Sequence, residues 1–130
     1  MTKAEISDTA LRRLADARAL IADKKDLATF FDALFAGADA DDVLMWDAAA
    51  LAKIAVTAKG LLEQHEFGQI YVKLYPGPDP KEPEDMLVAC NDDRPFLFDS
   101  ALRAATAAGA RIRAAFHPVV VQDGNPTSVI

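Results

Sequence analysis

The sequence predicts an α+β fold in which a helical segment comes first and a strand-containing segment follows. Apolar residues recur at helical spacing through an alanine-rich stretch, residues 4–58. From Ile70 to Tyr75 the pattern changes to strict alternation, which is typical of a half-buried strand. A third observation is the stretch CNDDRPFLFDSAL, residues 90–102, in which one apolar run ends in polar residues and another begins at once. These features divide the chain into residues 1–68, expected to be helical, and residues 69–130, expected to carry the strands.

Two amphipathic helices are the clearest expectations in the first segment. One is predicted to begin with Asp26 as its N-cap and to stop at Gly37. Its buried face is Leu27, Phe30, Phe31, Leu34 and Phe35, spaced i, i+3, i+4, i+7 and i+8. The phenylalanines in this set are expected to be core or interface residues. A longer helix is predicted to begin at Asp47, and Gly60 weakens its end by roughly 1 kcal/mol relative to alanine.

The second segment begins with two strands separated by a loop. The stretch PGPDPKEPED, residues 76–85, contains four of the seven prolines and can be neither a helix nor a central strand. After this loop, Met86–Cys90 is apolar at every position, as expected for a central strand.

A helix and two further strands complete the predicted order. Asp92 or Asp93 is expected to cap the helix, with Pro95 in its first turn and Gly109 at its end. Arg111–Val121 is predicted as a strand interrupted at Pro118, which favours an edge position or a bulge. The turn QDGNP then leads into a returning strand, Thr127–Ile130. The strand, helix and strand should form a right-handed crossover whose two strands lie parallel in one sheet.

Composition excludes several classes of protein. The chain is 52% hydrophobic and carries a net charge of −6, which indicates a soluble globular protein and argues against nucleic acid and anionic membrane surfaces as partners. No apolar run approaches the roughly 18 residues of a membrane span, and no signal peptide is predicted. Cys90 is the only cysteine, so no internal disulfide is possible and a cytoplasmic location is expected.

The sequence predicts no catalytic and no metal-binding residues. His65 and His117 are far apart and lack the spacing of metal ligands; His65 is expected to be exposed at a helix end, and His117 to be structural. Cys90 is expected to be an unreactive core thiol. The acidic residues between Asp39 and Asp42 fit no calcium loop and indicate a solvated helix start. The scattered glycines form no phosphate-binding loop.

One stretch is a candidate ligand site, at the point where a strand leads into a helix. Its residues are Asn91, Asp92, Asp93, Arg94, Pro95 and Phe96. The free N–H groups of a helix start can bind an anion such as an amino-acid carboxylate. Two aspartates at this position would repel such an anion. The residues alone therefore favour a purely structural helix start and leave an effector site as the second interpretation.

The stretch NDDRPFLFDSAL, followed by GARIRAAFHPVVV and a turn, resembles the N-terminal region of the large bacterial NAD-dependent glutamate dehydrogenases. The matching residues are Asn91, Asp92, Asp93, Pro95, Phe96, Leu97, Asp99, Ser100, His117, Pro118 and Val119. The resemblance implies a non-catalytic regulatory or oligomerisation module of an enzyme that converts glutamate to 2-oxoglutarate in amino-acid catabolism. It also implies that NAD and the catalytic residues belong to the rest of the parent chain, which is the expected partner, and that this segment holds no cofactor.

The same stretch is similar to the ACT family of regulatory domains, which bind amino acids at an Asp-Arg-Pro-Gly turn. Asp93, Arg94 and Pro95 match that turn, whereas Phe96 replaces the glycine, and its large side chain is expected to plug the pocket. The resemblance implies a partial ferredoxin-like β-α-β unit with antiparallel additions, truncated at its C-terminus. An open sheet edge would allow pairing into a homo-oligomer. The alternative is a free-standing ACT-type amino-acid-sensing domain.

Overall fold

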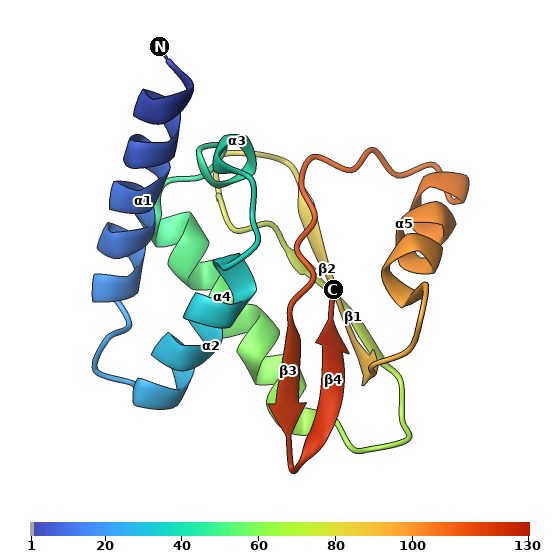
Figure 1. The fold of residues 1–130 in the computed structure, drawn as a ribbon. Helices are drawn as coiled ribbons and strands as arrows, with labels where there is room; N and C mark the ends of the chain where they lie inside the picture. Colours follow the sequence, from blue (N-terminus) through green and yellow to red (C-terminus); the bar gives the residue numbers. More distant parts are fainter. Residues whose placement is uncertain (1) are drawn as a thin grey trace.

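The computed structural model describes residues 2–130 and confirms an α+β fold, with helices followed by a four-stranded sheet (Figure 1). The helices are α1 (Lys3–Ala19), α2 (Lys25–Phe35), α3 (Ala40–Val43), α4 (Ala48–Gln64) and α5 (Leu97–Ala107). The strands are β1 (Tyr71–Pro76), β2 (Asp85–Asp92), β3 (Val119–Gln122) and β4 (Asn125–Val129). The sheet order is β1-β2-β4-β3, and each neighbouring pair is antiparallel.

The helix starts follow from local side chains in two cases and not in a third. Thr2 and Glu5 form a capping box at α1, each side chain accepting a backbone N–H of the other at 3.1 Å. The predicted start of α4 at Asp47 is confirmed, and Asp47 is its N-cap, because its carboxylate accepts the N–H of Ala50 at 2.7 Å. The N-cap of α2 is Lys24, so the prediction of Asp26 was wrong by two residues. Asp26 lies instead in the first turn, where its charge suits the helix dipole.

The core lies between the helices and one face of the sheet, called the inner face here. Helices α2 and α4 contact this face, and α1 packs on α3 and α4 (Figure 1). The phenylalanines of α2 are buried as expected, and the ring of Phe35 meets that of Phe116 edge to face at 5.2 Å. The sheet contributes Val88, Cys90 and Val129 to the same cluster. Helices and sheet therefore share one continuous core.

The opposite face of the sheet, the outer face, is largely open. Register pairs Leu74 with Leu87, and 61% and 51% of these residues are exposed. On the edge strand β3, Val119 and Val121 are exposed in the same way. β2 is central, as predicted, but its outer face is not fully covered: α5 lies on this side of the sheet (Figure 1), and Leu87 is still 51% exposed.

The β2–α5–β3 unit has the predicted parallel strands. β4 is antiparallel to both β2 and β3, so these two strands run in the same direction with β4 between them. The predicted strand Arg111–Val121 forms only from Val119, because Pro118 has no N–H to donate to a ladder. β3 is an edge strand, as the proline indicated.

The predicted turn between β3 and β4 is confirmed as a tight hairpin. Asp123 and Gly124 connect the two strands, with φ values of 52° and 80°. A two-residue hairpin with positive φ at both positions favours an Asp-Gly pair. The turn thereby fixes the register in which Gln122 faces Asn125.

Candidate ligand site at the β2–α5 turn

The six candidate residues form a continuous turn from the end of β2 to the start of α5. Asn91 and Asp92 are the last residues of β2, and each is only 8% exposed. The next four residues, Asp93 to Phe96, are exposed. The site therefore has a buried polar base and a solvent-facing rim.

Asp92 holds the loop between α4 and β1 against the end of β2. Its carboxylate oxygens accept the backbone N–H of Gly68 at 3.0 and 3.2 Å. Its own N–H donates to the Asn91 side-chain oxygen at 2.9 Å. Gly68 has φ of 83°, a conformation that glycine adopts without strain. The Asp92 carboxylate is thus occupied inside the protein.

Asp93 is the first of three side chains, followed by Ser128 and His117, that contact one another in a row. Its N–H donates to the carbonyl of Pro126 at 3.0 Å, and its carboxylate accepts the hydroxyl of Ser128 at 2.9 Å. Ser128 is fully buried and lies 3.1 Å from Nε2 of His117. Because the hydroxyl proton is directed to Asp93, the imidazole Nε2 is the donor in this contact. His117 therefore has the structural role expected for it, and Ser128 is a site residue that no sequence signal indicated.

The start of α5 differs from the prediction. Its N-cap is Phe96, and no side chain among the described residues caps the helix. The expectation that Asp92 or Asp93 would cap it was wrong, because their carboxylates bind Gly68 and Ser128 instead. Pro95 precedes the N-cap and so lies outside the first turn. The first N–H groups of α5 are therefore without a side-chain cap among the described residues.

Phe96 combines an unusual backbone with an exposed ring. Its φ is 63°, in the left-handed region that a glycine would occupy more easily. Its side chain does not plug a pocket, because 78% of the residue is exposed. The structure thus corrects the expectation that this ring would plug a pocket.

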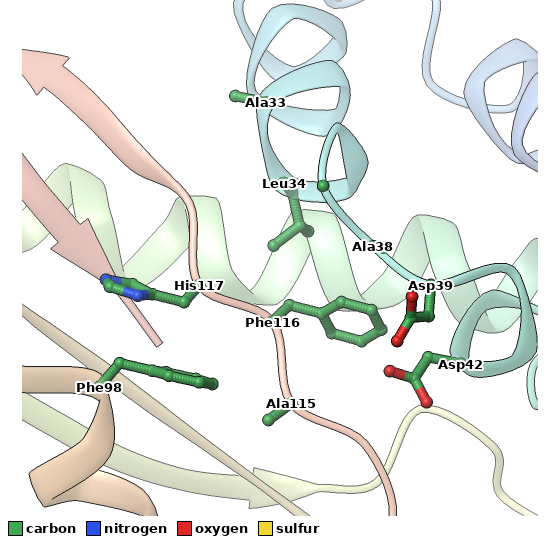
Figure 2. A pocket seen from close by; sticks show the side chains of 10 residues that line it. Ala33, Leu34, Ala38, Asp39, Asp42, Phe98, Ala115, Phe116 and His117 are labelled. Atoms are coloured by element: carbon green, nitrogen blue, oxygen red, sulfur yellow. The ribbon is translucent and has the colours of Figure 1, made fainter.

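A hollow of about 270 Å³ lies between α2, α3 and the segment before β3, and none of the six candidate residues lines it (Figure 2). The rings of Phe98 and His117 are stacked along one wall, with centroids 4.9 Å apart and an interplanar angle of 9°. The carboxylates of Asp39 and Asp42 approach the ring of Phe116 on the other side (Figure 2). His117 therefore connects the hollow to the hydrogen-bonded chain at the β2–α5 turn.

The remaining polar candidates are structural. His65 is 6% exposed, with Nε2 2.7 Å from the carbonyl of Gln69, so the expectation of an exposed histidine was wrong. Gln122 reaches across from β3 to the same place, and this contact between distant segments explains the burial. Burial also raises the pKa of the Cys90 thiol to about 11, in agreement with an unreactive core cysteine.

Two kinds of feature are absent from the part of the chain that the structure describes. Within residues 2–130, no group of three or more His, Cys, Asp or Glu side chains is placed to hold a metal ion. None of the helices formed by these residues has the length and apolar character needed to cross a membrane.

The fold and the turn together define an ACT-like domain. Strands β2 and β3 run parallel around α5, an Asp-Arg-Pro turn joins β2 to that helix, and the other strands are antiparallel additions. The family model for the ACT1 domain of glutamate dehydrogenase matches residues 30–128. The chain belongs to this family, which confirms its resemblance to the N-terminal region of glutamate dehydrogenases. It has no significant match among curated proteins or solved structures.

Proposed function

We propose that this chain is a non-catalytic regulatory and assembly module of a large NAD-dependent glutamate dehydrogenase, which works in amino-acid catabolism in the cytoplasm. Membership of the glutamate dehydrogenase ACT1 family supports the parent enzyme. The observation that carries a regulatory role is the β2–α5 turn, in which Asp92 and Asp93 are bound internally and leave the start of α5 without a side-chain cap among the described residues.

The nicotinamide cofactor belongs to another part of the parent enzyme in this proposal. A dinucleotide site needs a glycine-rich turn between a parallel strand and a helix. The corresponding turn here contains Pro95 and Phe96, and the six glycines of the chain lie in separate segments. The residues of this domain therefore do not fit NAD, and we assign no hydride-transfer step to them.

The effector proposed for the turn is an amino acid. Its carboxylate would accept N–H groups from the start of α5, where the helix dipole favours a negative charge. Arg94 is exposed in the same turn and offers a guanidinium that suits a carboxylate. Asp93 provides an acceptor for the ammonium group. The internal hydrogen bonds of the two aspartates reduce the repulsion that the sequence suggested.

Calorimetric titration of the chain with individual amino acids tests the effector site. A saturable heat is expected for at least one amino acid at millimolar concentration, and Arg94→Ala should abolish it. Arg103→Ala, an exposed arginine further along α5, is the matched control and should bind normally. If no amino acid produces heat, the effector role is refuted and the assembly role remains.

The native reading frame tests the parent enzyme separately. We expect it to continue from this domain into a dehydrogenase catalytic domain. A frame that stops soon after Ile130 would contradict that expectation and favour the free-standing amino-acid-sensing domain.

A further inference from the structure

The hollow between α2, α3 and the segment before β3 is separate from the β2–α5 turn and has a lining of its own (Figure 2). Its volume of about 270 Å³ lies near the lower end of the range for small-molecule sites, which is roughly 300–1,000 Å³. A dinucleotide or another large ligand is therefore too big for it, whereas a small organic molecule has the right size.

One side of the hollow carries two carboxylates that lack partners among residues 2–130. Asp39 and Asp42 both line the hollow, and their carboxylates are turned toward the ring of Phe116 (Figure 2). Asp39 is the N-cap residue of α3, a position at which aspartate ordinarily accepts a helix N–H, yet its side chain makes no capping hydrogen bond. Neither carboxylate takes part in an ion pair within this part of the chain. The hollow therefore has a negative side whose charge is not compensated.

The other side of the hollow is aromatic, and its rings are held in place by contacts from outside the hollow. The ring of Phe116 meets that of Phe35 edge to face at 5.2 Å. His117, which is stacked on Phe98, is fixed by its 3.1 Å hydrogen bond with the hydroxyl of Ser128. Walls that are already ordered lose little conformational entropy when a ligand binds, so the hollow is preformed for binding.

We propose that the hollow binds a small organic amine, with its protonated ammonium group at Asp39 and Asp42 and its apolar body against Phe116. The carboxylates attract the ammonium group by their opposite charge, and the face of an aromatic ring also attracts a cation. The two carboxylates repel each other, and a single ammonium group between them offsets that repulsion.

The lining favours an organic amine over a metal ion or an anion. A metal site of this kind needs several ligating side chains placed together, and within residues 2–130 no group of three or more His, Cys, Asp or Glu is so placed. An anion would meet two carboxylates, and no lysine or arginine lines the hollow. The carboxylate of an amino acid would be repelled for the same reason. The expected ligand is therefore an amine without an acidic group, different from the effector proposed for the turn.

An NMR titration of the isotope-labelled chain with phenethylamine tests the proposal. The backbone N–H signals of residues 38–42 and of Phe116 and His117 should shift saturably, with a dissociation constant in the millimolar range. Phenylethanol has the same ring but no charge, and it should bind about fivefold more weakly.

Two variants with the same change in net charge locate the binding. Asp42→Asn keeps the size of the side chain and removes its charge, so it should weaken the binding of phenethylamine about fivefold. Asp41→Asn is the matched control, because Asp41 is an exposed aspartate of the same helix and does not line the hollow. Its dissociation constant should stay within about twofold of the wild-type value. Circular dichroism of both variants verifies that the fold is retained.

Several results would overturn the proposal. The absence of a saturable shift at tens of millimolar phenethylamine would show that the hollow does not bind amines. Equal binding of phenylethanol would show that charge plays no part. Equal weakening by Asp42→Asn and Asp41→Asn would show only a general attraction of cations to an acidic chain, and shifts confined to residues 92–96 would place the amine at the turn. The effector role of the turn is tested separately by Arg94→Ala, so either proposal can fail without the other.

Discussion

Replacing Ser128 by alanine probes the hydrogen-bonded centre of the β2–α5 turn. The change removes the 2.9 Å bond to Asp93 and the 3.1 Å bond to His117 without opening a large cavity. A hydrogen bond to a charged group contributes about 1.5–3 kcal/mol and a neutral one about 1 kcal/mol. Because Asp93 is exposed and regains water, we expect the free energy of unfolding to fall by about 2 kcal/mol. The Tm should then fall by about 8 °C, at about 4 °C per kcal/mol.

Urea denaturation measures this loss directly. Circular dichroism follows the whole fold, and fluorescence of Trp46, the only tryptophan, follows the helical layer. Ser100→Ala, an exposed serine on α5, is the control and should stay within about 0.5 kcal/mol of the wild type. A loss for Ser128→Ala no larger than that of the control would refute the assigned contacts. A double-mutant cycle with Asp93→Ala should give a coupling energy above about 0.5 kcal/mol.

Three further changes test other contacts. Asp92→Ala leaves the N–H of Gly68 without its acceptor, so the free energy of unfolding should fall by about 1–2 kcal/mol. Hydrogen exchange at the Gly68 amide should become faster. An unchanged exchange rate would contradict the contact. Burial raises the pKa of the Cys90 thiol from 9.0 to about 11. The thiol of the unfolded chain therefore loses its proton at lower pH, and the free energy of unfolding should decline as the pH rises between these two values. An equal decline in Cys90→Ala would show that other groups cause it. Arg113→Ala removes the ion pair with Glu84 and the cation–π contact with the ring of Trp46. The free energy of unfolding should fall by about 1 kcal/mol, and the fluorescence of Trp46 should change. Arg111→Ala is the control and should change neither quantity.

Features encoded by neighbouring residues were predictable from the sequence. Asp47 lies directly before an apolar helical pattern and caps α4 in the structure. The alternation that begins at Ile70 gives β1, and the Asp123-Gly124 pair gives the β3–β4 hairpin. The Asp-Arg-Pro turn also lies where the family resemblance placed it, between β2 and α5. In each case the deciding interaction spans only a few positions along the chain.

Features decided by distant partners were not predictable. Asp92 binds Gly68, 24 positions away, and Asp93 binds Ser128, 35 positions away, so neither aspartate caps α5. The donors that bind these carboxylates, a backbone N–H and a serine hydroxyl, cannot be identified from the local sequence pattern. His65 is buried for a similar reason, since β3 brings Gln122 to the end of α4. Periodicity likewise predicts an apolar face but does not say whether a helix covers it.

The position of β4 affects how the domain assembles over time. β4 is the last strand in chain order, yet it occupies an interior position between β2 and β3. The β1–β2 hairpin can form early, but β2 acquires its second neighbour only after α5 and β3 have been synthesised, and such non-local pairing is slow. Docking of the β3–β4 hairpin is therefore the step expected to limit the folding rate. Substitutions that loosen its Asp-Gly turn would prolong an intermediate with an unpaired strand, the kind of species most prone to aggregate.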